Sequence, residues 1–381
     1  MQAAAQGAAT TRTVGIGLIG TGFMGGVHAR AYRNAPWIFP DAAAQPDLRI
    51  VADARLDDAR AFAERFGIPE WTDDWRTLLG RSDLDVIDVC TPPALHQRMA
   101  TEVAGAGKHV YCEKPVGRDL GETTAIWDAV RQAGVLSFVG LNYRFAPAVM
   151  LAKELIRAGR LGELRQVRVS MRTAYSAGGQ NIGGWRYSRE QAGAGTLGDH
   201  GSHVFDLATH LAGPIVRLCG TTVVSVPERD DPETKGATFT VDNDDTFAAL
   251  VEFASGATGI VDASRVATGS RGELTFDIVG STGAARWDLR RMNELQLFSA
   301  DAPPTEEGWK TIQTGPANWP YGQFIPSSLG LGYVDTKVIE VYRIVEAVAK
   351  REPISPNVGD MLHVARLIDA VQQGGWIDVA R

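Results

Sequence analysis

Gly-Leu-Ile-Gly-Thr-Gly-Phe-Met-Gly, running from Gly17 to Gly25, is the stretch that decides the fold. Gly20, Gly22 and Gly25 have the spacing G-x-G-x-x-G, with an apolar run before them and a helix-like run after them. The first glycine allows a tight turn, the second lets backbone approach a pyrophosphate, and the third lets the helix pack closely on the strand. A helix N-terminus also offers unpaired N–H groups to phosphates. Among 42 glycines the spacing alone is weak evidence, and a turn with no ligand is the alternative, but this context predicts a dinucleotide-binding fold.

The same order of elements repeats as far as residue 141. Strand-like runs alternate with helix-like runs: strands are predicted at 14–19, 48–53, 85–89, 108–112 and 135–139, and helices at 27–32, 56–66, 95–106 and 120–133. Alternation of this kind implies a parallel sheet with helices on both faces. We therefore expect an N-terminal α/β Rossmann domain over 14–141, preceded by a disordered leader over 1–13 that is rich in Ala, Gln, Gly and Thr.

From about residue 142 the pattern changes. A helix is predicted over 146–157, followed by short strands with turn-like joints at 164–171, 221–226, 246–253, 258–265, 273–279, 284–289 and 295–298. Closely spaced short strands of this kind favour an antiparallel sheet, one face of which must be covered by helices or by another subunit. We expect an α+β domain with an open antiparallel sheet over 142–381.

Composition and charge exclude several classes of protein. The chain is 44% hydrophobic and 22% charged, which is typical of a soluble globular protein. Its formal net charge of −7 provides no basic surface for nucleic acid or an anionic membrane, and no apolar run approaches the roughly 18 residues of a membrane span. Three cysteines without a C-x-x-C pair form neither a disulfide framework nor a thiolate zinc site. We expect a cytoplasmic protein with no nucleic-acid or membrane partner.

Asp53 closes the second predicted strand and bears on the choice of cofactor. A carboxylate there accepts hydrogen bonds from the adenosine ribose and repels a 2′-phosphate, so NAD is favoured over NADP. The interval between Gly25 and Asp53 exceeds the usual value of about 20 residues. The segment 36–40 and the Ala/Gln residues that follow it are interpreted as an insertion before the second strand. Two alternatives stay open: Arg55 pairs with a phosphate, or Asp53 serves as a helix N-cap.

Two further segments leave the carboxyl ends of predicted parallel strands, which is where open α/β sheets bind ligands. They are Cys90–His96, with the sequence Cys-Thr-Pro-Pro-Ala-Leu-His, and Glu113-Lys114-Pro115. Together with the glycine turn, Thr91-Pro92, His96 and Glu113-Lys114-Pro115 resemble the Gfo/Idh/MocA oxidoreductases, the family of glucose-fructose oxidoreductase and inositol dehydrogenase. Pro93 stands where that family commonly has Asn, which predicts one altered contact to the cofactor.

The resemblance implies roles for the residues that match. Lys114 reaches the reacting hydroxyl and the nicotinamide, Glu113 contacts the nicotinamide ribose, and the peptide before Pro115 is cis; the alternative for Lys114 is a solvated surface lysine. The residues predicted to bind the cofactor in this half are Gly20, Gly22, Phe23, Met24, Gly25, Asp53, Thr91, Pro92, His96, Glu113 and Lys114.

A second group of polar residues that could take part in catalysis lies in the C-terminal half of the chain. In a helix over 199–211, Asp199 and His203 are four residues apart and share one face. His203 can then take a hydroxyl proton while the carbon releases hydride, and Asp199 can orient or share that proton. The family's catalytic helix has the same Asp-x-x-x-His arrangement, here 14 residues after Trp185, and the resemblance implies that Trp185 and Arg186 approach the nicotinamide. The alternatives are a capped helix with surface histidines, a core tryptophan and a surface arginine.

A metal site is the other interpretation of this helix, since His200, His203 and His210 lie near two carboxylates in the sequence. Against it, His200 projects about 60° away from His203 on a helical wheel. No H-E-x-x-H pattern occurs in the chain. We therefore expect no metal.

These observations predict an NAD-dependent oxidoreductase that oxidises a secondary hydroxyl of a sugar, anhydrosugar or cyclitol, or reduces the keto form. The predicted catalytic residues are Lys114, Asp199 and His203, and the predicted substrate-binding residues are these three with Tyr143 and Arg144. The long Pro-, Gly- and Trp-rich segment 301–333, with a helix over 335–350, resembles the sugar-oxidising members akin to levoglucosan dehydrogenase. The family resemblance also implies a homodimer or homotetramer formed through the sheet.

Two alternative functions remain open. Some relatives use transient oxidation by NAD to cleave glycosides without net redox change. The same fold also serves non-catalytic regulators that bind a dinucleotide or a sugar.

Overall fold

The N-terminal half forms the predicted Rossmann sheet, with strand order β3-β2-β1-β4-β5-β6 and every pairing parallel. The computed structural model describes residues 12–178, 183–318, 321 and 329–379, so all but two residues of the predicted leader lie outside the described residues. The strands are β1 (Thr13–Ile19), β2 (Gln45–Ala52), β3 (Glu70–Thr72), β4 (Val86–Val89), β5 (His109–Cys112) and β6 (Ser137–Val139). The helices are α1 (Phe23–Ile38), α2 (Leu56–Phe66), α3 (His96–Gly105) and α4 (Leu120–Ala133), with 3-10 turns η1 (Trp75–Leu78), η2 (Pro93–Leu95) and η3 (Asn142–Phe145).

The first part of the segment interpreted as an insertion, residues 36–38, lengthens α1. Pro36 lies inside the helix, which ends at Ile38. The next residue, Phe39, stacks on Tyr342 of α8 with ring centroids 4.1 Å apart. This tertiary contact stabilises the end of a helix that extends beyond the predicted range of 27–32.

The C-terminal half forms a nine-stranded sheet of order β16-β15-β14-β13-β7-β12-β11-β8-β17, beside a small hairpin of β9 and β10. The strands are β7 (Leu164–Thr173), β8 (Ile215–Val223), β9 (Glu228–Asp230), β10 (Thr238–Thr240), β11 (Thr246–Phe253), β12 (Thr258–Ser264), β13 (Arg271–Gly280), β14 (Gly283–Asp288), β15 (Glu294–Ser299), β16 (Lys310–Gln313) and β17 (Trp376–Asp378). All pairings in the large sheet are antiparallel except that of β7 with β12. Strand β16 lies within the segment 301–333, for which no element was expected.

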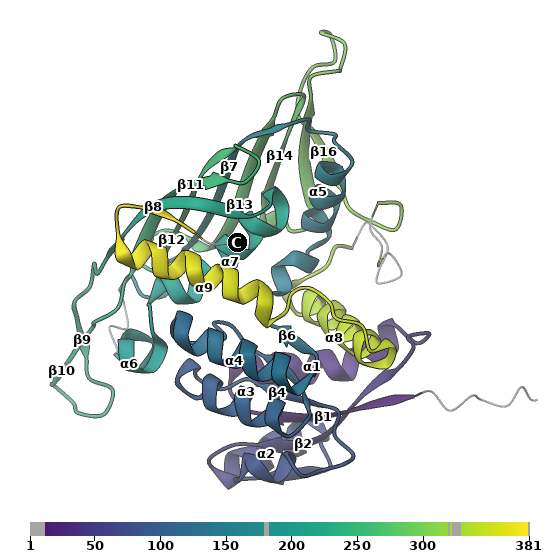
Figure 1. Ribbon diagram of the computed structural model, residues 1–381, viewed down its shortest axis with the longest axis vertical. Helices are drawn as coiled ribbons and strands as arrows, with labels where there is room; N and C mark the ends of the chain where they lie inside the picture. The colour runs from purple at the N-terminus through teal and green to yellow at the C-terminus, as the bar shows by residue number, and fades with distance from the viewer. Residues whose placement is uncertain (1–11, 179–182, 319–320, 322–328, 380–381) are drawn as a thin grey trace, which may run out of the picture.

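Helices cover one face of this sheet (Figure 1). They are α5 (Pro147–Arg157), α7 (Thr196–Ala212) and α9 (Val358–Gln373). This half also contains α6 (Arg189–Ala192), α8 (Tyr333–Lys350) and the 3-10 turns η4 (Trp185–Tyr187) and η5 (Leu289–Arg291). The chain passes through α7 between β7 and β8, and a crossover of this kind allows β7 to pair in parallel with a later strand. Among the described residues, no helix is both long enough and apolar enough to cross a bilayer.

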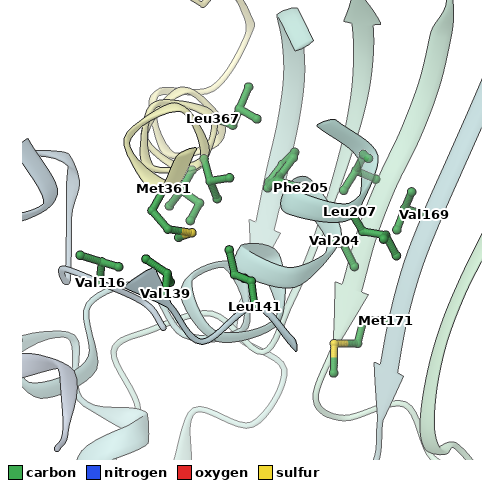
Figure 2. Packing of buried hydrophobic residues seen from close by; sticks show 14 of the residues in the cluster. Val116, Val139, Leu141, Val169, Met171, Val204, Phe205, Leu207, Met361 and Leu367 are labelled. Carbon is green, nitrogen blue, oxygen red and sulfur yellow. The ribbon is translucent and has the colours of Figure 1, made fainter. Parts of the chain in front are cut away.

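Helix α7 lies in the apolar core that joins the two halves. Figure 2 shows Val204, Phe205 and Leu207 of α7 between Val169 of β7 and Met361 of α9, with Val139 of β6 nearby. Helix α8 returns to the first half and packs along α1 (Figure 1). Its buried residues share one apolar cluster with β1 and α1. The two halves are therefore held together by helices on both sides of the cavity described next.

Candidate active site

A cavity of about 1070 Å³ lies where the carboxyl ends of the Rossmann strands face the first turns of α7. Most of the residues predicted from the sequence line it. They are Gly20, Gly22, Phe23, Met24, Asp53, Thr91, Pro92, Glu113, Lys114, Tyr143, Trp185, Arg186, Asp199 and His203. The two polar groups that lie far apart in the sequence thus share one cavity.

The three glycines of the turn meet three different requirements. Gly20 has a φ of +105°, which favours glycine. A Cβ on Gly25 would lie 2.1 Å from the carbonyl oxygen of Gly20, so only glycine lets α1 start this close to the strand. Around Gly22 nothing lies within 4 Å of an added Cβ, so the backbone there faces open space in the cavity. These are the positions of a tight turn, a close packing contact and a phosphate approach.

We expect Gly22→Ala to weaken cofactor binding and Gly25→Ala to lower stability. Gly22 has φ −69° and ψ −168°, which alanine adopts without strain, so its variant should keep the wild-type melting temperature and bind NADH about tenfold more weakly. The Gly25 variant should lose about 1–3 kcal/mol of unfolding free energy through overpacking. Thermal unfolding and NADH titration of both variants test this. A stable Gly25→Ala protein would contradict the packing role.

Asp53 is held by the glycine turn. One carboxylate oxygen accepts hydrogen bonds from the backbone N–H and the hydroxyl of Thr21, at 3.0 and 2.6 Å. The N-cap of α2 is Arg55, so the N-cap alternative for Asp53 is wrong, although its other oxygen accepts from Arg55 N–H at 3.3 Å. The Arg55 guanidinium pairs with Asp58. The carboxylate is thus fixed in the cavity wall beside the turn.

Lys114 follows β5 and reaches across the cavity. Its ammonium forms an ion pair with the Asp199 carboxylate on α7, and its backbone N–H donates to the Glu113 carboxylate at 3.1 Å. The Lys114–Pro115 peptide is cis, as the resemblance implied. The Lys114 side chain is only 18% exposed, so the alternative of a solvated surface lysine is wrong.

His96 takes part in the site only indirectly. It is fully buried, with its ring nitrogens 2.8 Å from the carbonyl oxygen of Pro115 and 2.7 Å from that of Thr91. Burial lowers the pKa of His96, and a neutral ring has one N–H, so it donates to one of the two carbonyls at a time. It is not among the described residues that line the cavity. His96 therefore ties together the two loops that carry Thr91 and Lys114.

The start of α7 is anchored by the segment before β11. The Asp244 carboxylate accepts hydrogen bonds from the backbone N–H groups of Gly195 and Leu197, at 2.9 and 2.7 Å. The Thr196 hydroxyl donates to the carbonyl oxygen of Asp245 at 2.9 Å. Because these contacts fix the first turn, they also fix the direction in which Asp199 points.

Electrostatics give Asp199 and His203 different protonation states. Burial alone raises the pKa of Asp199, but the nearby Lys114 and His200 outweigh it and lower that pKa well below its usual value. Burial lowers the pKa of His203 far below its usual value, and Lys114 lowers it further. Tyr143 contacts the His203 ring edge to face, with centroids 4.7 Å apart. The pair at neutral pH is thus a carboxylate and a neutral imidazole that can accept a proton.

The sequence interpretation weighed His200 only as a metal ligand, but it lines the same cavity. Its Nε2 lies 3.2 Å from the Thr173 hydroxyl, and its ring stacks on Tyr175 at 6.0 Å. Its buried Nδ1 has no hydrogen-bond partner among the described residues and lies 3.7 Å from an Asp199 oxygen. Burial lowers the pKa of His200 to about 4. His200 and His203 are about 60° apart on the helical wheel, and this angle still lets both side chains face the same wide cavity.

The three histidines of α7 do not act together. His210 is not among the described cavity residues, and its electrostatic neighbours are Arg144, Lys153 and Arg343. Within the described residues, the group whose atoms lie close enough to hold a metal is His28, Asp88 and Cys90. Those atoms are instead hydrogen-bonded to one another, at 2.9–3.3 Å.

Arg144, predicted to bind substrate, lies behind the cavity wall. It is 7% exposed, pairs with Asp206 of α7 at 2.8 Å and donates to the Ser355 hydroxyl at 2.5 Å. It is not among the described residues that line the cavity. Its neighbour Tyr143 does line it, as does Tyr333 at the end of the segment 301–333. Tyr175 and Arg265 also line the cavity, and the sequence interpretation did not select them. Arg144 therefore supports α7 from behind the cavity, away from the surface where a ligand would be expected.

Comparisons with known proteins agree with this geometry. Residues 14–141 match the model described as "Oxidoreductase family, NAD-binding Rossmann fold", and residues 149–286 match the GFO/IDH/MocA C-terminal domain. Levoglucosan dehydrogenase from Pseudarthrobacter phenanthrenivorans is 36% identical, over 97% of this chain and 98% of the relative. The chain belongs to the Gfo/Idh/MocA oxidoreductase family.

Other members of the Gfo/Idh/MocA family extend the comparison. A solved structure of levoglucosan dehydrogenase in complex with NADH and levoglucosan has a TM-score of 0.92 at 37% identity, covering 97% of this chain and all of the other. Inositol 2-dehydrogenase from Rhizobium meliloti is 26% identical over 94% of this chain and 96% of its own length. The chain is thus an oxidoreductase whose fold matches that of its relatives from end to end.

Proposed function

We propose that this chain oxidises a secondary hydroxyl of a sugar, anhydrosugar or cyclitol by transferring hydride to NAD. The observation that carries the proposal is the ion pair of Lys114 with Asp199, one helical turn from His203, in the cavity that also contains the glycine turn. The names of relatives that act on levoglucosan and inositol support the substrate class.

The chain's own residues account for the proton in this reaction. Lys114 donates a hydrogen bond to the substrate oxygen, and Asp199 holds its ammonium in place. His203, neutral because of its lowered pKa, accepts the hydroxyl proton as the C–O bond becomes a carbonyl. The hydrogen on the same carbon leaves with its electron pair as hydride, which NAD accepts when bound. In the reverse direction His203 returns the proton.

Positioning supplies a further part of the rate. Tyr143 fixes the His203 ring and lies 5.9 Å, centroid to centroid, from the ring of Tyr333 at the start of α8. Both tyrosines line the cavity, as does the apolar Met171. A substrate carbon held against the nicotinamide between these groups avoids the entropic cost of a bimolecular encounter.

The direct experiment measures NADH formation from NAD across a panel of levoglucosan, inositols and aldoses. We expect net NADH with at least one of them and activity about 10³-fold lower in a Lys114→Ala variant. Release of nitrophenol from nitrophenyl glycosides without NADH accumulation would support the glycosidase alternative. NADH binding with no turnover of any compound would support the regulator.

We also propose NAD as the preferred cofactor, because the fixed Asp53 carboxylate repels a 2′-phosphate. Asp53→Ser should therefore shift the ratio of kcat/KM for NAD to that for NADP by about 10- to 100-fold towards NADP. The matched control is Asp57→Ser, which removes the same charge from a side chain that is 90% exposed on the first turn of α2. An unchanged ratio in Asp53→Ser would contradict the assignment.

A homo-oligomer formed through the face of the large sheet opposite α7 is part of the proposal. Side chains such as Leu250, which is 51% exposed, alternate there with buried residues along β11. Light scattering on the purified protein should give a dimer or tetramer, and Leu250→Glu should lower the mass. We place the protein in the cytoplasm, since all three cysteines are free thiols.

A further inference from the structure

A buried cluster of charged side chains lies directly behind Glu113. It joins the Rossmann sheet to α8, and its members are His28, Tyr32, Asp88, Cys90, Tyr111, Glu113, Lys337 and Glu340. Lys337 has no exposed side-chain surface, and its ammonium lies 2.7 Å from Glu113 and 2.8 Å from Glu340. The sequence around Lys337 does not indicate its contact with Glu113, because the two residues are 224 positions apart.

Glu113 is the one carboxylate in this cluster that lines the cavity. Its Oε1 accepts hydrogen bonds from His28 at 2.9 Å and Lys337 at 2.7 Å, and its Oε2 accepts from the backbone of Lys114 at 3.1 Å. A Cβ on Gly140 would lie 2.3 Å from Oε1, so the carboxylate is also enclosed by backbone. Its place and direction are fixed from three sides.

The charges in the cluster explain why Lys337 is required. The Asp88 carboxylate outweighs burial and raises the pKa of His28 to about 9, so His28 is a cation. Burial raises the pKa of Glu340. The two cations of the cluster, His28 and Lys337, lie against the carboxylates of Asp88 and Glu113. Without Lys337, His28 alone would have to compensate both carboxylates. A buried carboxylate without a cation is costly and takes up a proton or moves towards water.

We propose that Lys337 is a positioning residue for cofactor binding, which keeps the Glu113 carboxylate ionised and aimed into the cavity from the far side of the sheet. The inference rests on the proposed function and on the role that the family resemblance implies for Glu113, which is contact with the nicotinamide ribose. A hydrogen bond to a charged acceptor is stronger than one to a neutral acid, so the state of Glu113 determines how tightly the cofactor binds.

The test compares two variants on the same face of α8. Lys337→Met removes the cation that contacts Glu113, whereas Glu340→Gln alters the same cluster and still leaves Lys337 on Glu113. Both should lower the melting temperature. Only Lys337→Met should weaken NADH binding, by about tenfold, measured by fluorescence titration without substrate. Lys337→Arg, which keeps the charge, should recover part of the affinity.

A double-mutant cycle with Glu113→Gln completes the test. If Lys337 acts through Glu113, adding Lys337→Met to Glu113→Gln changes NADH affinity no further. Wild-type affinity in Lys337→Met, or equal weakening in Glu340→Gln, overturns the inference. Wild-type affinity in Glu113→Gln would instead refute the proposed cofactor role of Glu113. Should Lys337→Met fail to fold, Lys337→Gln replaces it, with the same expected shift and the same contradicting result.

Discussion

Lys114→Ala is expected to lower kcat about 10³-fold while leaving NADH affinity within a few-fold of wild type. The variant removes the hydrogen-bond donor to the reacting oxygen. It also leaves Asp199, a carboxylate with 38% of its side chain exposed, without its cation beside His203. Steady-state kinetics on the substrate found in the panel, together with NADH titration, measure the two effects separately.

A second lysine provides the matched control for Lys114. Lys153 donates to the carbonyl oxygen of His210 at the other end of α7, and it is not among the described residues that line the cavity. Lys153→Ala removes a lysine contact to the same helix and should retain kcat. Equal losses in the two variants would mean that Lys114 only supports α7.

His203→Asn is expected to lower kcat by about 10²- to 10³-fold and to change the pH profile. Because burial and Lys114 lower the pKa of His203, its neutral form prevails at pH 7 and is lost only as the pH falls through that lowered pKa. In the wild type, kcat for oxidation should therefore decline only well below pH 6.5. That acidic decline should be missing from the residual activity of the variant.

His210→Asn is the control for this prediction, since it changes a histidine seven positions later on the same helix and outside the cavity. It should keep the wild-type profile. An acidic decline that survives in His203→Asn would assign the proton acceptor to another group.

The parts of the site that local sequence could predict are those in which neighbours in the chain also act together. The glycines of the turn are such residues, because the clash that a Cβ on Gly25 would make is with Gly20, five positions earlier in the same turn. Asp199 and His203 are another case, since helical periodicity alone places them on one face. The active-site role of Lys114 was predicted from its position after a predicted strand and from the family resemblance.

The parts that sequence could not predict depend on the packing of distant segments. Helix α8 returns to the Rossmann half and brings Lys337 to Glu113, a contact that no local pattern encodes. Arg144 was predicted to bind the substrate, but its guanidinium forms an ion pair with Asp206 inside the core. Strands of three residues such as β3 and β9 are too short for alternation to be recognised.

Transfer of deuterium tests the central claim most directly. Ring-deuterated levoglucosan, or the best substrate from the panel labelled in the same way, is incubated with NAD and the purified protein. The mass of the nucleotide product is then measured by mass spectrometry. The account predicts net NADH that carries one deuterium, formed by the wild type and about 10³-fold more slowly by Lys114→Ala. NAD that binds but gains no deuterium from any labelled sugar or cyclitol would contradict it.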